Sequence, residues 1–415
     1  MTSISPSPNP LSPVNPPPDP VTSRRGEKGR IDDIEALRAI AIVFVMIWHY
    51  HRAPGYGAIT PPSFSHWFNL GVGVDLFFVI SGFVVARSLF ASLLGVEGGR
   101  NRRRIAYQFW TRRVFRLFPS VWLWLSIILL CASFTIRPDL WQSVETNMWA
   151  SLSVVLHYAN YRFATHFMQD PFGASFPYWS LSLEEQFYLI LPIAMLLVIR
   201  LRFLALFCAA LVAWTFLVNR GILGIVFRWE GLAFGVGLAV FARSTLYQSA
   251  VRVARRWQLP ACPIIITALA GVAIFASSGF QEFFTISPSR SYNLVALAAL
   301  IAVFFASMDL DILSRGRRLK ATLNWIGARS YALYLCHIPA LYASAEIITR
   351  MGLDDDLLQP GRHILTVIIA VPLAFFCSHL NFKHIEQPFN VYGRAKAPRW
   401  FAVARPKLAA GNPNP

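Results

Sequence analysis

The sequence predicts an all-α, polytopic integral membrane protein with about ten transmembrane helices surrounding a polar passage. Of its 415 residues, 55% are hydrophobic and only 14% are charged, whereas a typical soluble domain carries about 25% charged residues. The apolar residues fall in runs that are long enough to cross a bilayer as helices. This composition excludes a disordered chain, a collagen and a small disulfide scaffold.

Basic residues indicate how these runs are oriented. Lys and Arg number 38 against 21 Asp and Glu, for a net charge of +17. In a soluble chain this excess would suggest nucleic-acid binding. Here the basic residues bunch in the gaps between apolar runs, as in cytoplasmic loops that face anionic lipids. We therefore expect a lipid bilayer, and no nucleic acid, as the partner of these charges.

The ends of the chain differ from its centre. Residues 1–29 contain eight prolines and little apolar bulk, which predicts a disordered, Pro-rich cytoplasmic tail. The basic cluster from Arg24 to Arg30 follows the prolines, the reverse of the order in a signal peptide. We expect a transmembrane domain over residues 30–392 and a basic cytoplasmic C-terminal tail over residues 393–415, with no appended soluble catalytic domain.

Eleven apolar runs follow the tail. They are Ala36–Tyr50, Val72–Leu94, Leu117–Ile136, Ala150–Ala159, Leu183–Ile199, Phe203–Val218, Ile225–Ala242, Ile264–Ser277, Leu294–Met308, Ile326–Ile348 and Ile364–Leu380. Clusters of Arg and Lys follow the second, fifth, seventh, ninth and eleventh runs. The excess of basic residues in these loops predicts that all of them are cytoplasmic.

The fourth run conflicts with this orientation if it spans. An odd number of crossings is needed between the outer loop at Arg137 and the inner Arg200, yet two runs lie there. Ala150–Ala159 is the shorter and carries His157 and Tyr158. We therefore predict that it lies along the outer interface or dips in and returns. About ten helices then cross the cytoplasmic (inner) membrane, with both termini in the cytoplasm.

The five cysteines predict neither a disulfide framework nor a metal site. They lie in or beside apolar runs, with no CxxC pair and no His at zinc spacing. We expect them to be small core residues and expect no metal.

Ionisable residues inside apolar runs are candidates for function, because burying them in a membrane is costly. The first run begins with Arg38 and ends with His49. Eleven residues make about three helical turns, so the two side chains share a face about 16 Å apart and could line one passage. A neutral imidazole can accept a proton from a hydroxyl near pH 7; a hydrogen-bonded packing role is the alternative for His49.

A second candidate is the arginine pair Arg113 and Arg116, which lies just before the third run. A spacing of three places both on one helix face. Paired guanidinium groups suit phosphates, which they bind through bidentate hydrogen bonds. Anchoring at the cytoplasmic face of the membrane explains the pair equally well.

A third set consists of acids at the starts of apolar helices. Glu184 and Glu185 follow Trp179 closely, and Asp75 lies in a Gly-rich stretch. Helix capping or a bond to a neighbouring helix is the alternative for each. We treat Asp75, Trp179 and Glu185 as residues that bind substrate or support the site. Four later residues are expected to be mainly structural: His337, Glu346, His379 and Glu386.

Six stretches that cover most of the chain together resemble the membrane acyltransferase 3 family. They are Glu35-Ala36-Leu37-Arg38-Ala39 ending in His49, the helix Val74–Phe83, the pair Arg113 and Arg116, the stretch Trp179–Tyr188, the stretch Gly327–Pro339 and Ile385-Glu386-Gln387-Pro388-Phe389. Each stretch alone is a weak signal, but their order makes the resemblance specific. We expect no additional esterase-like domain of the kind that some relatives carry.

The resemblance implies a fold, an activity and a site. Family members have about ten membrane helices and move an acyl group, often acetyl from coenzyme A, onto hydroxyls of extracytoplasmic glycans or secondary metabolites. Their basic residue, ten intervening positions and catalytic histidine fall on Arg38 and His49. Their donor-binding arginine pair falls on Arg113 and Arg116, and the glutamate of their Trp-rich motif on Glu184.

The resulting expectation is a membrane O-acyltransferase that uses acetyl-CoA or another acyl-CoA and no metal. Arg38, Arg113 and Arg116 would bind the donor phosphates, and His49 would act as a base or as an acyl carrier. Glu184 would be the second catalytic residue, orienting the imidazole as the carboxylate of a triad does. The acceptor is a hydroxyl of a glycan, a glycolipid or a macrolide-like metabolite.

Two other classes of protein remain open at this stage. A transporter or flippase of a lipid-linked or small-molecule substrate would also bury charges and carry a basic cytoplasmic rim. A catalytically silent scaffold in a polysaccharide assembly complex is the third interpretation.

Overall fold

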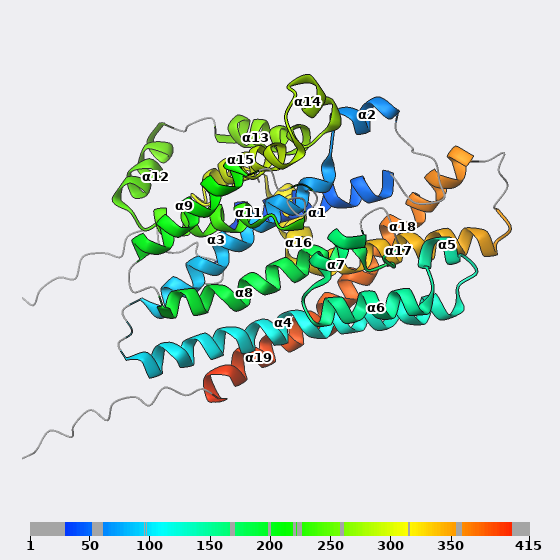
Figure 1. The fold of residues 1–415 in the computed structure, drawn as a ribbon, viewed down its shortest axis with the longest axis horizontal. Helices are drawn as coiled ribbons and strands as arrows, with labels where there is room; N and C mark the ends of the chain where they lie inside the picture. Colours follow the sequence, from blue (N-terminus) through cyan, green and yellow to red (C-terminus); the bar gives the residue numbers. More distant parts are fainter. Residues whose placement is uncertain are drawn as a thin grey trace, which may run out of the picture. The chain divides into compact units, whose positions relative to one another are not determined.

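The computed structural model describes residues 30–51, 61–94, 96, 98–166, 171–197, 201–218, 221, 226–257, 261–313, 316–353 and 359–400. All the regular secondary structure in these residues is helical, which confirms the predicted all-α class. In chain order (Figure 1) the elements are α1 (Asp32–His51), α2 (Pro62–Trp67), η1 (Leu70–Val72), α3 (Gly73–Leu93), α4 (Gly99–Phe134), α5 (Pro138–Trp141), α6 (Val144–Val155), α7 (Ala159–His166), η2 (Phe176–Tyr178), α8 (Trp179–Leu197), α9 (Leu201–Leu217), α11 (Trp229–Phe241), α12 (Thr245–Trp257), α13 (Ala261–Phe275), α14 (Ser278–Phe283), α15 (Pro288–Ala306), α16 (Arg317–Ala328), α17 (Ser330–Arg350), α18 (Gln359–Asn381), the π-helical turn η4 (Phe382–Glu386) and α19 (Gln387–Trp400).

Both predicted tails lie wholly or partly outside this description. Residues 1–29 are not described, and neither are residues beyond Trp400. The predicted boundary between residues 392 and 393 falls inside α19. The division into tails and a membrane domain stays a prediction.

Seven helical segments of the described residues are long and apolar enough to cross a membrane. They are Asp32–His51, Leu70–Leu93, Gly99–Phe134, Phe176–Leu197, Pro288–Ala306, Ser330–Arg350 and Gly361–Pro398. The bent pair Thr245–Arg256 and Ala261–Phe275 can count as an eighth span, and α9 and α11 are two shorter apolar helices. The described residues therefore contain seven candidate spans, or eight if the bent pair is one span, and the chain is a multi-pass membrane protein.

The fourth apolar run does not form a helix of spanning length. α6 ends at Val155, and His157 adopts a left-handed backbone conformation with a φ of 58°. α7 then begins at Ala159. The chain therefore turns within the run, and α6 packs beside α4 (Figure 1).

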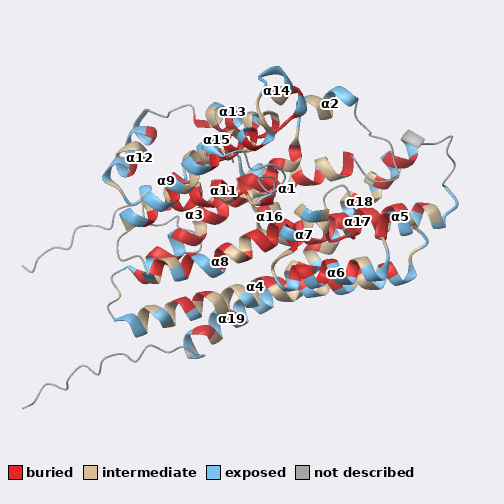
Figure 2. Cartoon of the chain, viewed as in Figure 1, coloured by how far each residue is buried: buried red, intermediate tan, exposed pale blue. Residues whose placement is uncertain are grey.

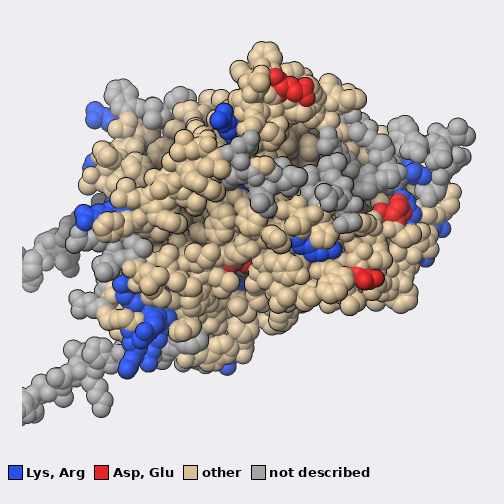
Figure 3. All heavy atoms as spheres, viewed as in Figure 1, with Lys and Arg blue, Asp and Glu red and all other residues tan. Residues whose placement is uncertain are grey.

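α4 is longer than the bilayer is thick. Its 36 residues extend for about 54 Å, whereas the hydrocarbon core of a bilayer measures about 30 Å. Its first turns carry three consecutive arginines, residues 102–104, and Figure 3 shows Lys and Arg side chains gathered where α4 begins. α19 packs along α4, with the ring of Tyr392 centred 5.2 Å from the ring of Phe115.

The interior of the bundle is built around α3 and α17. α3 packs against α1, α11 and α15. Gly82 on α3 meets Gly235 on α11, where a Cβ on either glycine would collide with the backbone of the other helix. Small residues let the two backbones approach closely. α17 is the most deeply buried of the seven spans, as Figure 2 shows.

The first turn of α1 is tied to the segment that precedes α16. The carboxylate of Asp33 accepts hydrogen bonds from three backbone N–H groups in residues 310–313, at 3.0 to 3.2 Å. Lys320 lies between Asp311 and Asp32, and these two carboxylates raise the pKa of Lys320. These contacts hold the beginning of α1, from which Arg38 projects one turn later.

Candidate active site

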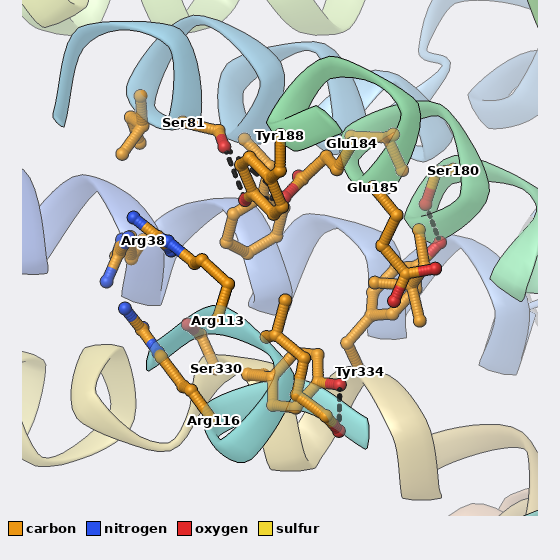
Figure 4. Close-up of a pocket in the computed structure, with 16 residues that line it drawn as sticks. Arg38, Ser81, Arg113, Arg116, Ser180, Glu184, Glu185, Tyr188, Ser330 and Tyr334 are labelled. Atoms are coloured by element: carbon orange, nitrogen blue, oxygen red, sulfur yellow. Dashed lines mark hydrogen bonds between the residues drawn. The ribbon is translucent and has the colours of Figure 1, made fainter. Parts of the chain in front are cut away.

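A cavity of about 80 Å³ lies between α1, α3, α4, α8 and α17. The residues that line it are Arg38, Val74, Phe77, Ile80, Ser81, Arg113, Arg116, Leu117, Ser180, Leu181, Glu184, Glu185, Tyr188, Ser330, Tyr331 and Tyr334. They come from five helices that are far apart in the sequence, and Figure 4 draws their side chains as sticks. The lining contains three arginines and two glutamates, an unusual concentration of charge inside a membrane bundle.

The three arginines reach the same side of the cavity. Arg38 comes from α1, while Arg113 and Arg116 come from one face of α4, as their spacing predicts. Figure 4 shows Arg38 and Arg116 at one side and Ser180 at the other. The guanidinium of Arg113 lies 4.8 Å from the centre of the Tyr188 ring. Nε of Arg116 is buried and has no hydrogen-bond partner among the described residues.

Glu184 faces these arginines from α8. The hydroxyl of Tyr188 donates to Oε2 of Glu184 at 2.5 Å. The hydroxyl of Ser81 lies 2.7 Å from that of Tyr188 and 3.3 Å from the same carboxylate oxygen. Glu184 is thus held by two hydroxyl groups, and it offsets part of the positive charge of Arg38 and Arg113.

Glu185 lines the same cavity and is paired at its other side. Its carboxylate contacts Nδ1 of His157, which lies in the turn between α6 and α7. This carboxylate raises the pKa of His157. The side-chain amide of Gln186 donates to the carbonyl of His157 at 2.7 Å and holds the turn. Glu185 therefore connects the cavity wall to the turn between α6 and α7.

Asp75 and Trp179 meet at a different charged group. Nη1 of Arg228 donates to Oδ2 of Asp75 at 2.5 Å. The guanidinium of Arg228 also lies 5.0 Å from the centre of the Trp179 ring and 4.6 Å from that of Tyr292. Neither Asp75 nor Trp179 is among the residues that line the cavity.

His49 lies beyond the cavity, near the end of α1. Its Nδ1 is 3.0 Å from Nε2 of His337 on α17. Its ring makes an edge contact with the ring of Phe176, and the two ring centres are 5.4 Å apart. The ring of His337 is centred 5.6 Å from that of Tyr334, whose side chain lines the cavity. Tyr334 therefore lines the cavity and contacts His337, which contacts His49, while His49 itself is not among the lining residues. The expected passage from Arg38 to His49 stays a prediction.

Tyr334 is held in place by hydrogen bonds at its hydroxyl group. Its hydroxyl donates to the carbonyl of Pro177 at 2.5 Å, and the hydroxyl of Ser180 lies 2.6 Å from it. Because the carbonyl can only accept, the Ser180 hydroxyl is the donor in the second bond.

Comparison with known proteins agrees with this arrangement of residues. A family model described as an acyltransferase domain matches residues 31–380. The chain belongs to the acyltransferase 3 family. The resemblance seen in the six motifs is thereby confirmed.

Among similar proteins of this acyltransferase family are two bacterial enzymes. Peptidoglycan O-acetyltransferase OatA of Listeria monocytogenes is 26% identical over 387 residues, which are 88% of this chain and 56% of that protein. O-acetyltransferase OatA of Staphylococcus aureus is 24% identical over 380 residues, 87% of this chain and 57% of that protein. The chain thus spans little more than half the length of the relatives it matches. No solved structure matches it.

The structure of this acyltransferase-family protein brings together residues that lie far apart in the sequence. Arg38, Arg113, Arg116, Glu184 and Glu185 share one cavity. The partner that the structure shows for His49 is His337, whereas Glu184 bonds to hydroxyl groups of α3 and α8.

Three residues that the sequence analysis set aside lie in or near the candidate site. His337 and Glu386 were expected to be mainly structural, and Arg228 was not considered. His337 contacts His49 across 288 residues of sequence. Glu386 is buried in the π-helical turn, and Arg116, Arg38 and Arg329 are basic groups that act on its carboxylate. The motifs around His337 and Glu386 were visible, but no spacing rule connects helices so far apart in the sequence.

Metal ligands do not cluster in the part of the chain that the structure describes. No group of three or more His, Cys, Asp or Glu residues there could hold a metal ion. The site residues are instead basic groups, carboxylates, hydroxyls and imidazoles.

Proposed function

We propose that the protein is a membrane O-acyltransferase that moves an acyl group, acetyl in the first instance, from coenzyme A to a hydroxyl of a glycan or glycolipid. The observation that supports this most is the cavity inside the helix bundle of this acyltransferase-family chain. Three arginines line the cavity, and Tyr334, which also lines it, contacts His337 of the His337–His49 pair. The donor would then bind at one depth of the helix bundle, and the chemistry would take place at another.

The arginine side of the cavity suits the phosphates of an acyl-CoA donor. Three guanidinium groups face two carboxylates, and one of these, Glu185, is already paired with His157. The unpartnered Nε of Arg116 is a buried donor that a phosphate oxygen would satisfy. The lining residues therefore fit an anionic donor, with Arg38, Arg113 and Arg116 as its ligands.

The present volume of the cavity limits how the donor can bind. A space of about 80 Å³ accommodates on the order of five water molecules. An acyl-CoA is much larger, so its thioester arm can reach His49 only if the wall at Tyr334 and Ser180 moves aside. Such a movement breaks two hydrogen bonds. Because the wall stays in place until the donor is bound, it limits the access of water to the reacting groups.

His49 would provide the acid–base chemistry. In direct transfer its imidazole takes the proton of the acceptor hydroxyl, and the oxygen attacks the thioester carbonyl. The C–S bond then breaks, and the coenzyme A thiolate receives the proton from the imidazolium, so no net proton is consumed. Alternatively, His49 accepts the acyl group first and passes it to the hydroxyl.

The acceptor is proposed from the relatives. The Listeria relative is named a peptidoglycan O-acetyltransferase, so peptidoglycan fragments are the first acceptors to test. We place the protein in the cytoplasmic membrane with both termini inside. The basic start of α4, shown in Figure 3, would then face the cytoplasm, where acyl-CoA is made.

The test is an assay of the purified full-length protein in detergent or liposomes, with ¹⁴C-acetyl-CoA and muropeptides, lipid-linked sugars or macrolides as acceptors. Mass spectrometry of the products identifies the acylated hydroxyl. We expect transfer by the wild type and a loss of about 100- to 10,000-fold in His49→Ala, which is the usual contribution of a general base.

Arg252→Ala is a matched control for loss of a positive charge, because Arg252 is exposed on α12 and does not line the cavity. It should keep wild-type activity. Full acyl transfer by a folded His49→Ala protein would contradict the assignment. Movement of a substrate across liposomes without acylation would indicate a transporter instead.

A further inference from the structure

The hydrogen-bond partners of His337 determine which of its nitrogens carries the proton. Nδ1 of His337 lies 2.8 Å from the carbonyl oxygen of Tyr334 and 3.2 Å from that of Leu333. Carbonyl oxygens can only accept hydrogen bonds. Nδ1 of His337 must therefore be the N–H donor, and in the neutral ring Nε2 carries a lone pair.

That lone pair points to His49. Nε2 of His337 is 3.0 Å from Nδ1 of His49, and the two rings are centred 5.0 Å apart. An acceptor at this distance requires an N–H on Nδ1 of His49. Among the described residues, no carboxylate forms an ion pair with either ring. The neutral His49 ring consequently has its lone pair on Nε2, the nitrogen on the side away from His337.

We infer that His337 is a positioning residue that fixes the tautomer of His49 and makes Nε2 of His49 the reactive atom. The inference rests on the proposed function, because it assigns an atom to the base or acyl carrier of that reaction. In direct transfer, Nε2 takes the hydroxyl proton. In the two-step route, Nε2 forms the bond to the acyl carbon as the C–S bond breaks. The same lone pair serves both routes.

Neighbouring hydrogen bonds and close packing hold the rings of His49 and His337 in place. His337 is fully buried in α17, and the Tyr50 hydroxyl, on the residue next to His49, donates to the backbone carbonyl of His337 at 3.0 Å. A second buried tyrosine, Tyr178, donates to the carbonyl of Leu335 at 2.6 Å. Rotation of the His337 ring would break both of its Nδ1 contacts inside this packed region, so the tautomer of His337 is determined by the backbone of α17.

This pair differs from the histidine–carboxylate pair of a triad. A carboxylate both orients the imidazole and offsets its positive charge. A neutral imidazole orients its neighbour but brings no charge. When Nε2 of His49 is protonated, the extra charge is shared across the two rings and faces the two carbonyl oxygens of α17.

Two substitutions separate orientation from packing. His337→Leu removes the acceptor, whereas the amide oxygen of His337→Gln can still accept from Nδ1 of His49. Ser344→Ala is the matched control, since Ser344 is buried on the same helix and bonds only to the carbonyl of Ala340 among the described residues. The full-length proteins are assayed for acetyl transfer, for KM of acetyl-CoA and for thermal stability.

We expect kcat to fall about 100-fold in His337→Leu, within the range of a lost general base, while KM changes less than threefold. His337→Gln should recover kcat to within about tenfold of the wild type, and Ser344→Ala should match the wild type. Wild-type kcat in His337→Leu would overturn the inference. Equal losses of kcat in folded Leu and Gln variants would also overturn it, since a packing role makes no such distinction.

A measurement that needs no acyl transfer keeps this inference separate from the proposed function. Solid-state NMR of ¹⁵N-histidine-labelled protein in liposomes distinguishes protonated from unprotonated ring nitrogens, and His49→Gln assigns the signals. We expect the Nδ1–H tautomer of His49 in the wild type and a mixture of tautomers in His337→Leu. An Nε2–H tautomer in the wild type would overturn the inference even if acyl transfer is observed. Absence of transfer with the expected tautomer would contradict only the proposed function.

Discussion

Two buried charged regions lie on either side of α3, and they differ in how their charges are matched. In one, Arg228 is bonded to Asp75 and flanked by the rings of Trp179 and Tyr292. Its Nε has no hydrogen-bond partner in the part of the chain that the structure describes, but its charge is offset by a carboxylate at 2.5 Å. In the other, Arg38, Arg113 and Arg116 line a cavity, where Arg38 lies 3.5 Å from Glu35 and Nε of Arg116 has no hydrogen-bond partner among the described residues.

The difference supports the proposal that one region stabilises the fold and the other binds a ligand. A buried ion pair that is broken costs stability, because the remaining charge has left water without compensation. Arginines that line a cavity can instead be compensated by an anion from outside the chain. We therefore propose that Asp75 maintains the integrity of the bundle, and donor binding by the arginines of the cavity stays a prediction.

The largest expected effect tests the Arg228 region. Asp75→Ala leaves Arg228 buried without its carboxylate and should lower the free energy of unfolding by about 3–5 kcal/mol. Denaturant unfolding in mixed micelles measures this change. The double variant Asp75→Leu/Arg228→Met removes both charges and should regain most of the loss. If it is as unstable as Asp75→Ala, the ion pair is not the source of the stability.

The second prediction concerns the arginines of the cavity. Arg113→Ala or Arg116→Ala should weaken acetyl-CoA binding about 10- to 100-fold, as expected for loss of one charge-assisted contact of about 1.5–3 kcal/mol. The unfolding midpoint should change little. Calorimetry or equilibrium binding of labelled acetyl-CoA provides the measurement, with Arg252→Ala as the control. Unchanged affinity in both variants would place the donor elsewhere.

A smaller effect is expected at the wall between the cavity and His337. Tyr334→Phe removes the bonds to Pro177 and Ser180 and should cost about 0.5–1.5 kcal/mol of stability, because the Ser180 hydroxyl can still donate to the carbonyl of Pro177. Acetyl-CoA affinity should stay within about twofold, since no arginine is lost. Thermal unfolding and donor binding of the same sample compare the two quantities. A large drop in affinity at unchanged stability would make Tyr334 a ligand-binding residue.

The smallest effect depends on pH. Because Glu185 raises the pKa of His157, the ion pair contributes its stability fully below the ordinary histidine pKa of about 6.5. This contribution is lost as the pH rises through the raised pKa. The difference in Tm between the wild type and His157→Gln should therefore be larger at pH 6 than at pH 9, corresponding to less than about 1 kcal/mol. A Tm difference between the two proteins that grows with pH would contradict this prediction.

Sequence patterns predicted much of this architecture correctly. Hydropathy identified the helices, and the parity of basic loops indicated that Ala150–Ala159 is not a simple span, which agrees with the turn at His157. The spacing of Arg113 and Arg116 placed both on one face of α4. These predictions succeeded because each depends on neighbours along one helix or on the alternation of apolar and basic segments.

Such sequence patterns could not predict the contacts between helices. Glu184 was expected to orient His49, yet its carboxylate bonds to Tyr188 and Ser81, and the ring beside His49 belongs to His337. The role of Glu184 in catalysis stays a prediction. Sequence spacing places a side chain on a face of its own helix, but it does not say which helix that face will meet.

The sequence by itself determined that this is a helical membrane protein, which residues carry charge into its interior and which of them share a helix face. Only the tertiary structure decided that three arginines enclose a cavity, that Asp75 is matched by Arg228, and that His337 lies against His49. The physical reason is that hydropathy and helical periodicity are local properties, whereas the pairing of buried charges and rings depends on how α1, α3, α4, α8 and α17 pack against one another.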